Sequence, residues 1–339
     1  NIKNLNNIIK LYKGNYNFNN EELIILREDL YFIQSKRINE ILIIMKFRNI
    51  NGINKNLQPE YDEIILQETF FLTLIYYDLA KALEYYFENY EIDEEINKKE
   101  INKAIEICIK RDNLESFKFL LNKCYNLDSC YERNDEELLD LIVKQNGIKI
   151  LNYLFKNGLD IHSDMEYALS ESSYNGYLKI VEYLVEKGAN IHARNNNALL
   201  WASVNGHLEV VKFLIENGAD IHAGNDEALS EASYNGHLKI VEYLVEKGAN
   251  VNAKNNLALI YASTNGHLDV IKFLVEKGAD IQAENNQALI RAAENGHLKV
   301  VKFLIENGAD IPAVDNRALI WASLNRHLEV VELLKSYLQ

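Results

Sequence analysis

The second half of the chain repeats itself with a period of 30 residues. Three sets of residues recur in this step, and they are Gly158, Gly188, Gly218, Gly248, Gly278 and Gly308; Gly176, Gly206, Gly236, Gly266 and Gly296; and Ala-Leu pairs that begin at Ala168, Ala198, Ala228, Ala258, Ala288 and Ala318. A unit of this length cannot bury its apolar surface alone, so it must pack against neighbouring copies. The period therefore predicts an elongated array of small units rather than a globule.

Each unit contains two segments with helical periodicity. In the unit that begins at Ala198, apolar and small residues recur on one face of 198–205, and a wider apolar stripe runs through 208–217. Gly206 separates the segments and can adopt a positive φ, while Gly218 follows the second segment, where a left-handed C-cap is common. The pattern predicts a helix, a tight turn and a second helix in every unit.

An Asn or Asp residue stands two positions before each Ala-Leu pair of the later units. These residues are Asn196, Asp226, Asn256, Asn286 and Asn316. Asn and Asp are preferred N-cap residues because their side-chain oxygen accepts a hydrogen bond from a free backbone N–H. We therefore expect them to cap the first helix of their units.

Fainter copies of the unit precede the regular ones. Residues 138–164 fit the same spacing, and two earlier copies of 34 residues begin near Phe70 and Ala104. These boundaries divide the chain into a helical N-terminal region or cap (1–69), degenerate repeats (70–167), regular 30-residue repeats (168–317) and a C-terminal capping repeat (318–339). In the capping repeat, Arg326 replaces the turn glycine, and the end becomes more polar at Glu332, Lys335 and Ser336.

The regular unit resembles the ankyrin repeat. It reads A-L-x-x-A-S-x-N-G-H-L-x-V-V-x-F-L-x-x-x-G-A-D-I, and the resemblance extends over about residues 70–339, most clearly from 138. It implies an all-α solenoid of stacked helix-turn-helix units. The Asn-rich 30-residue version is similar to the ankyrin-repeat proteins of giant, Mimivirus-like DNA viruses, with amoebal or other A/T-rich hosts as an alternative source.

The unit departs from the family pattern in two places. It is about three residues shorter than the usual ankyrin repeat, and Asn-x-Ala-Leu replaces Thr-Pro-Leu-His at the start of the first helix. The missing residues fall in the β-hairpin finger between units. We therefore expect short fingers with little strand, and binding through the concave helical face.

Composition excludes several classes of function. A net charge of −14 opposes the electrostatic attraction that dominates nucleic-acid binding. No apolar run approaches the roughly 20 residues that a membrane-spanning helix needs, and the start of the sequence lacks the apolar stretch of a signal peptide. Three cysteines suit a reducing compartment. We expect a monomeric, intracellular protein, located in the host cytoplasm if it is viral, with the virion as an alternative.

The histidines occur at two repeat offsets, and we assign neither to a metal. Equivalent residues of successive units should lie about 10 Å apart, which is too far to share one zinc ion. We expect the turn series to hydrogen-bond loop backbone and hold units in register, and the finger series to be solvated or bonded within its loop. The turn series is His207, His237, His267, His297 and His327, and the finger series is His162, His192 and His222.

No other motif indicates catalysis. The sequence has no phosphate-binding Gly-rich loop ending in Lys-Ser/Thr, no Gly-x-Ser-x-Gly and no His-Glu-x-x-His. Cys108, Cys124 and Cys130 are interpreted as structural or incidental thiols, since no second ligand pair follows at zinc spacing. We expect no enzyme activity, no cofactor and no metal.

Variation within the repetition gives the candidate site. Most offsets carry the same residue in each unit, but the outward side of the first helix changes, and it supplies Trp201, Glu231, Tyr234, Tyr261, Arg291 and Trp321. Aromatic residues and Arg dominate interface hot spots. We predict a protein-binding groove at these residues. The alternative is that the two tryptophans and Tyr234 pack against the neighbouring first helix as core residues.

The function that follows is a non-catalytic scaffold or adaptor that binds a protein partner, which could be a host protein. Residues 1–69 either cap the first unit or recruit a second protein. The sequence Leu-Gln-Pro-Glu at 57–60 is similar to the opening of an F-box-like module, which would make the chain a substrate adaptor of a ubiquitin ligase. A structural virion protein is the other alternative.

Overall fold

A computed structural model describes residues 94–123, 135–157 and 165–338. Within these ranges the fold is all-α, with sixteen helices and no strand, as the sequence predicts. The chain divides into two compact units, Asn1–Ile161 and His162–Gln339. The expectations for residues 1–69, for the copy near Phe70, and for His162, Cys124 and Cys130 lie outside the described residues.

In the described part of the first unit, four helices form two pairs. They are α6 (Glu94–Arg111), α7 (Leu114–Lys123), α9 (Asp135–Lys144) and α10 (Ile148–Lys156). Ile105, Phe117 and Ile142 are among the fully buried side chains, and Cys108 is buried with them. The Asp112 carboxylate accepts hydrogen bonds from the backbone N–H groups of Lys149 and Ile150 at 3.0 and 3.1 Å. This joins the turn of one pair to the start of the next pair's second helix.

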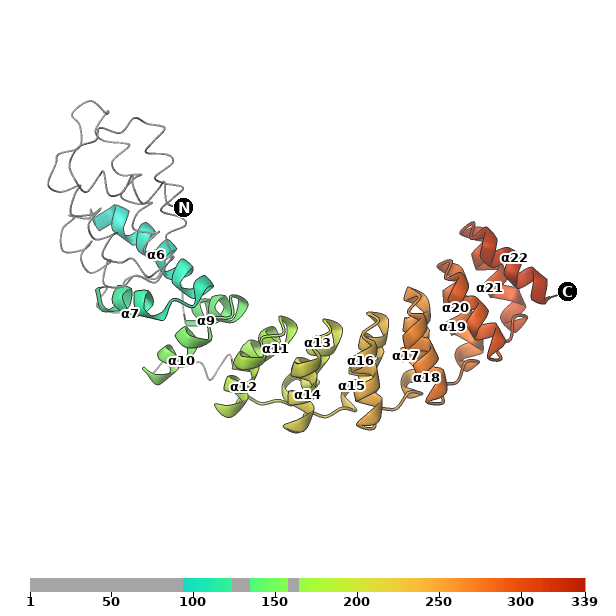
Figure 1. The fold of residues 1–339 in the computed structure, drawn as a ribbon, viewed down its shortest axis with the longest axis horizontal. Coiled ribbons are helices and arrows are strands. Elements are labelled where there is room, and N and C mark those ends of the chain that lie inside the picture. The colour runs from blue at the N-terminus through green and yellow to red at the C-terminus, as the bar shows by residue number, and fades with distance from the viewer. Residues whose placement is uncertain (1–93, 124–134, 158–164, 339) are drawn as a thin grey trace, which may run out of the picture. The chain divides into compact units, whose positions relative to one another are not determined.

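The second unit is a row of six helix pairs (Figure 1). Its first-helix layer consists of α11 (Met165–Tyr174), α13 (Ala193–Val204), α15 (Ala223–Tyr234), α17 (Ala253–Asn265), α19 (Ala283–Glu294) and α21 (Ala313–Leu324). Its second-helix layer consists of α12 (Leu178–Glu186), α14 (Leu208–Glu216), α16 (Leu238–Glu246), α18 (Leu268–Glu276), α20 (Leu298–Glu306) and α22 (Leu328–Tyr337).

The two layers pack differently along the row. Neighbouring first helices contact each other over much of their length, whereas neighbouring second helices touch at few positions. Small buried residues such as Ala202 and Ser203 allow this close approach of the first helices, and larger residues such as Val210, Val211 and Leu214 fill the core from the second helices. The first-helix layer therefore forms the inner side of the row.

A single left-handed turn lies at the start of the first helix, inside its stated bounds, in α13, α15, α17 and α19. Arg194, Asn195 and Asn196 have φ values of 49, 61 and 59°, and the same three positions repeat this geometry in α15, α17 and α19. Non-glycine residues rarely adopt this conformation, and Asn and Asp tolerate it best. This requirement accounts for the Asn-rich finger, and the absence of strands from the described residues agrees with the short finger that we expected.

The predicted capping role of the finger Asn and Asp residues is wrong. These side chains are buried and make no cap hydrogen bond; instead their Oδ1 atoms accept a bond from a backbone N–H of the next unit. The bonds are Asp220 N–H to Asn196 (2.8 Å), Asn250 N–H to Asp226 (3.0 Å), Asp280 N–H to Asn256 (2.7 Å) and Asp310 N–H to Asn286 (2.7 Å). The left-handed backbone turns each side chain away from its own helix. Asn316 has the same positive φ, at 60°.

The turn histidines link successive units, as predicted. Each ring places Nε2 at 2.8–3.0 Å from a carbonyl oxygen near the end of the preceding first helix, and the carbonyls belong to Tyr174, Val204, Tyr234, Thr264 and Glu294. Two finger histidines bond within their own loop, His192 to Asn196 and His222 to Asp226. In the described residues no group of three or more side chains could hold a metal ion.

The histidines also explain the turn glycines. Gly206 has φ of +81°, and a Cβ atom there would lie 2.8 Å from the His237 ring of the next unit. The same clash would occur at the other turn glycines of the row, from Gly176 to Gly296. Arg326 occupies the equivalent position with φ of 62°, and no histidine ring of a following unit lies against it in the described residues. Glycine is therefore required for space as well as for conformation.

Candidate protein-binding surface

The first-helix layer carries the residues that the sequence singles out. Trp201, Tyr234 and Trp321 have 37, 40 and 40% of their surface exposed, Arg291 is exposed, and Glu231 and Tyr261 are half-buried. The tryptophans and Tyr234 are therefore not buried core residues, although Trp201 and Tyr234 each contact a ring on a neighbouring first helix. Their neighbours Ala202 and Ser203 fill the contact between first helices instead.

Aromatic side chains pair across the boundaries between units. Tyr174 meets Trp201 edge to face, with ring centroids 5.6 Å apart, and Tyr234 meets Tyr261 in the same way at 5.3 Å. Such pairs are favoured by the ring quadrupoles. Tyr174 was not among the predicted site residues, although it shares the repeat offset of Tyr234. The pairs hold large apolar rings at the surface in fixed orientations.

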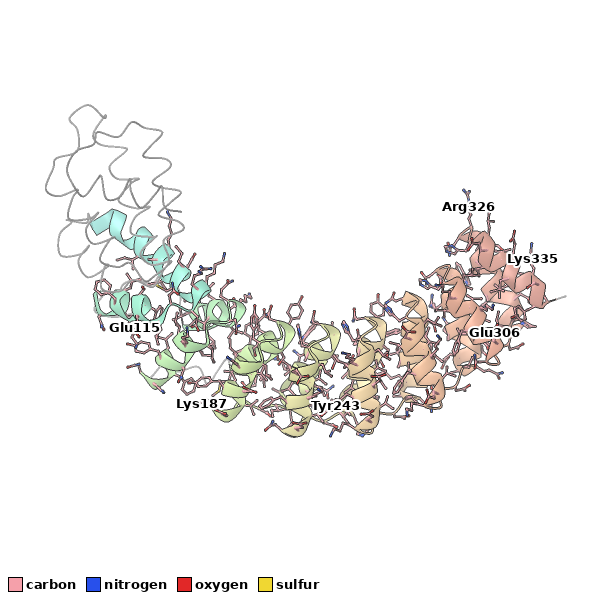
Figure 2. All side chains as sticks on the ribbon, in the orientation of Figure 1. Glu115, Lys187, Tyr243, Glu306, Arg326 and Lys335 are labelled. Carbon is pink, nitrogen blue, oxygen red and sulfur yellow. The ribbon has the colours of Figure 1, made fainter. Side chains whose placement is uncertain are left out.

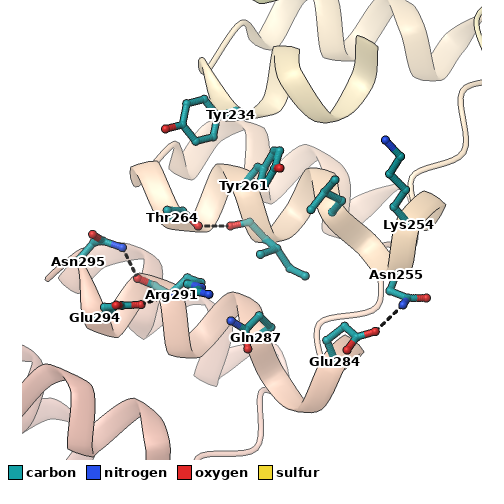
Figure 3. A pocket seen from close by; sticks show the side chains of 12 residues that line it. Tyr234, Lys254, Asn255, Tyr261, Thr264, Glu284, Gln287, Arg291, Glu294 and Asn295 are labelled. Atoms are coloured by element: carbon teal, nitrogen blue, oxygen red, sulfur yellow. Dashed lines mark hydrogen bonds and ion pairs between the residues drawn. The ribbon is translucent and has the colours of Figure 1, made fainter. Parts of the chain in front are cut away.

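A groove opens between α17 and α19, beside the end of α15 (Figure 3). Its volume is about 630 Å³, and three of the six predicted residues, Tyr234, Tyr261 and Arg291, line it. Leu257 and Ile260 contribute to its lining as well. Trp201, Glu231 and Trp321 lie outside the groove, along the same layer of helices. The structure thus brings half of the predicted residues together in one cavity.

Most charges in and beside the groove are paired. Arg291 donates from Nη1 to Glu294 at 2.8 Å, and with the Gln287 amide rotated, the Gln287 oxygen accepts from Arg291 Nε at 2.8 Å. Asn255 donates to Glu284 at the other end of the groove (Figure 3). These contacts hold the polar side chains that line the groove against one another.

A second electrostatic feature lies on α15, next to the groove. Burial is the main cause that raises the pKa of Glu231 above its ordinary value, and the nearby Glu227 carboxylate raises it further. Lys254 acts in the opposite direction and lies 3.8 Å from a Glu227 oxygen. The charged form of Glu231 is thus held in an unfavourable environment.

The last helix pair has a different surface. Glu332, Lys335 and Ser336 are exposed, in keeping with a polar end, but Leu324 and Leu328 are also 66 and 70% exposed. Ile320 is exposed as well. Ile260 and Ile290, which occupy the same repeat position in two preceding pairs, are buried. The polar cap that the sequence predicts therefore covers only part of this end of the row.

Comparison with known proteins gives one match. A family model described as ankyrin repeats (3 copies) matches residues 139–225, 223–285 and 282–338. No curated protein matches the chain. In the described part of the chain, no helix has the length and apolar character that crossing a bilayer requires.

Proposed function

The chain belongs to the ankyrin-repeat family, whose repeats are generally protein–protein interaction modules, and on this premise we propose that it is a non-catalytic scaffold or adaptor. It binds its partner on the first-helix layer, around the groove between α17 and α19. Solenoids of this kind bind through extended surfaces made by successive repeats. Binding rather than chemistry is the activity that the surface supports.

The observation that carries the proposal is the row of exposed aromatic rings on the first-helix layer. Trp201, Tyr234 and Trp321 are large and partly exposed, and two of them are fixed by contact with a neighbouring ring. An aromatic side chain offers a large contact area while it loses little rotamer entropy on binding. Because these side chains are already held in place, little conformational entropy is lost when a partner binds them.

From α12 to α20, the second-helix layer has no large apolar side chain among the exposed ones of the described residues; only α22 has them, at Leu328 and Tyr337. On this layer, Lys187, Lys247 and Lys277 place their ammonium groups 5.3–5.4 Å from the ring centroids of Tyr183, Tyr243 and Phe273, and Lys187 and Tyr243 lie on the outer side of the row (Figure 2). A lysine over a ring covers its apolar face and keeps a charge in water. This layer is therefore a solvated surface, and the partner binds the opposite one.

The proposal is tested by capture of proteins from a source-cell lysate, with quantitative mass spectrometry. Trp201→Ala combined with Trp321→Ala removes two exposed rings, and Lys239→Ala on α16 is the surface control. We expect a protein that the wild-type chain and the control retain to be lost with the double variant. If the captured proteins are the same for all three chains, the first-helix layer is not the binding surface.

The finer expectations from the sequence stay predictions. They are the resemblance to ankyrin proteins of giant viruses, recruitment of a ubiquitin ligase through residues 1–69, a structural role in the virion, a monomeric state and an intracellular location. The N-terminal region lies outside the described residues, and co-purification of ligase components with the full chain, but not with a chain that lacks 1–69, would support the ligase role.

A further inference from the structure

One repeat offset on the first-helix layer carries an alternating series of side chains. In chain order these are Glu171, Trp201, Glu231, Tyr261, Arg291 and Trp321. Because α13, α15 and α17 contact one another in sequence, Glu231 lies between the helices that carry Trp201 and Tyr261. A carboxylate with an aromatic residue on either side therefore occupies the middle of the predicted binding surface.

Glu231 is the charged member of this series that has no partner. The Glu171 carboxylate accepts a hydrogen bond from Asn175 Nδ2 at 3.1 Å, and Arg291 pairs with Glu294 at 2.8 Å. The Glu231 carboxylate makes no hydrogen bond or ion pair with any of the described residues. Lys254, the nearest cation to act on it, is paired with Glu227. Glu231 is thus half-buried, and its carboxylate has no hydrogen-bond or ion-pair partner among the described residues.

The unpaired carboxylate determines which kind of partner side chain can bind at this position. An apolar side chain packed over Glu231 would bury an unpaired carboxylate, which is strongly unfavourable. An acidic side chain would meet the charges of both Glu227 and Glu231. A basic side chain would pair with the carboxylate, and the neighbouring ring faces attract cations. Charge complementarity therefore selects a basic group.

We propose that the Glu231 carboxylate binds an arginine side chain of the partner protein, and that this arginine lies between Trp201 and Tyr261. Arginine fits better than lysine because its planar guanidinium stacks on aromatic rings and forms two parallel hydrogen bonds with a carboxylate. The inference rests on the proposed function and adds to it the chemistry of the partner. The raised pKa of Glu231 supports it, since a bound cation would stabilise the charged form.

Substitution of the neighbouring Lys254 provides a second test, in which arginine binding should become tighter and not weaker. Lys254 lies beside Glu227 and reduces the negative potential at Glu231. Lys254→Gln leaves both carboxylates without this cation, so an arginine-bearing ligand should bind more tightly to the variant. A role of Lys254 in direct contact with the ligand would have the reverse result.

The probe is a set of fluorescent seven-residue peptides with random flanks and a fixed central residue, which is arginine, citrulline or glutamate. Binding to the full chain is measured by fluorescence anisotropy at low salt. Citrulline keeps the shape of arginine and removes its charge. We expect the arginine set to bind at least tenfold more tightly than the citrulline set, and the glutamate set to bind least.

The matched variants are Glu231→Gln and Glu276→Gln, which remove the same charge from the two layers. Glu276 is exposed on α18 and serves as the control. We expect Glu231→Gln to abolish the preference for arginine over citrulline, and Glu276→Gln to retain it. Helical content should be unchanged in both variants, and neither should melt at a lower temperature than the wild type.

Three outcomes overturn the inference: equal binding of the arginine and citrulline sets, an unchanged preference in Glu231→Gln, or no binding by any set. These outcomes are distinct from failure of the proposed function. If Trp201→Ala with Trp321→Ala abolishes capture from the lysate while Glu231→Gln leaves it intact, the surface binds protein but not through an arginine at Glu231. If neither variant changes capture, the partner does not bind the first-helix layer, and the proposed function fails as well.

Discussion

The bond between units at Asn286 gives the sharpest test of how this array is held together. The Asn286 side chain is buried, with 4% of its surface exposed, and its Oδ1 accepts the Asp310 N–H at 2.7 Å. Its backbone has φ of +63°. Substitution by Ala removes the acceptor and also places a β-carbon residue in the left-handed region, whereas substitution by Gly removes the acceptor alone.

These two effects give the expected magnitudes. A part-buried N–H that loses its acceptor costs about 1–3 kcal/mol, and a left-handed Ala costs about 1 kcal/mol more than Gly. Asn286→Gly should therefore lower the free energy of unfolding by about 1–3 kcal/mol, and Asn286→Ala by about 2–4 kcal/mol. The order of the two variants follows from the positive φ.

The unit two repeats earlier supplies a control. There Asp226 takes the place of Asn and accepts the Asn250 N–H at 3.0 Å, so the acid and the amide have exchanged positions relative to Asn286 and Asp310. Asn286→Asp alone brings two carboxylates close together and should be destabilising. Asn286→Asp combined with Asp310→Asn reproduces the arrangement found at Asp226 and should recover most of the lost stability.

The free energy of unfolding is measured by urea denaturation followed by circular dichroism, and exchange of the Asp310 amide hydrogen is measured by NMR. Local loss of the bond should accelerate that exchange in the Ala and Gly variants but not in the double variant. The account would be refuted if Asn286→Ala were as stable as the wild type, if it were no less stable than Asn286→Gly, or if the double variant were the least stable of the set.

Three further predictions concern the turns and the charged surface. Gly266→Ala should lower the melting temperature strongly, since its Cβ would lie 2.6 Å from the His297 ring and its backbone has φ of +77°. His297→Ala in the same chain should remove the clash and recover part of the lost melting temperature. If the second substitution recovers nothing, the packing argument is contradicted. Arg326→Gly, at the equivalent turn without such a ring, should change the melting temperature little, and a large loss there would count against the same explanation. Burial, and after it the Glu227 charge, raise the pKa of Glu231 in the folded state, so the stability of the wild type falls as pH rises from the ordinary pKa of 4.5 through the raised one. Glu231→Gln should therefore be more stable than the wild type at pH 7, by about 0.2–0.5 kcal/mol if the i,i+4 repulsion with Glu227 sets the scale, and the difference should vanish below pH 4.5. A variant that is less stable at pH 7 would show that the carboxylate has a structural partner.

Part of the proposed binding surface could be predicted from the sequence. The offset that carries Trp201, Glu231, Tyr261, Arg291 and Trp321 was identified because it varies while packing positions repeat. Exposure could not be read in this way, since an aromatic residue at this offset suits either a core or a surface. The edge-to-face pairing of Tyr174 with Trp201 depends on the distance between two helices of different units, which no local pattern contains.

The sequence by itself determined the elements that depend on neighbours along the chain: the two helices of each unit, the turns with positive φ and the all-α stack. These follow from periodicity and from the conformations that glycine and asparagine tolerate. Tertiary structure decided what joins one unit to the next. Asn196 and its equivalents reach across to a backbone N–H 24 residues ahead, and each turn glycine makes room for a histidine of the following unit. Such contacts depend on which surfaces face each other after the units have stacked, and a residue's own helix does not specify them.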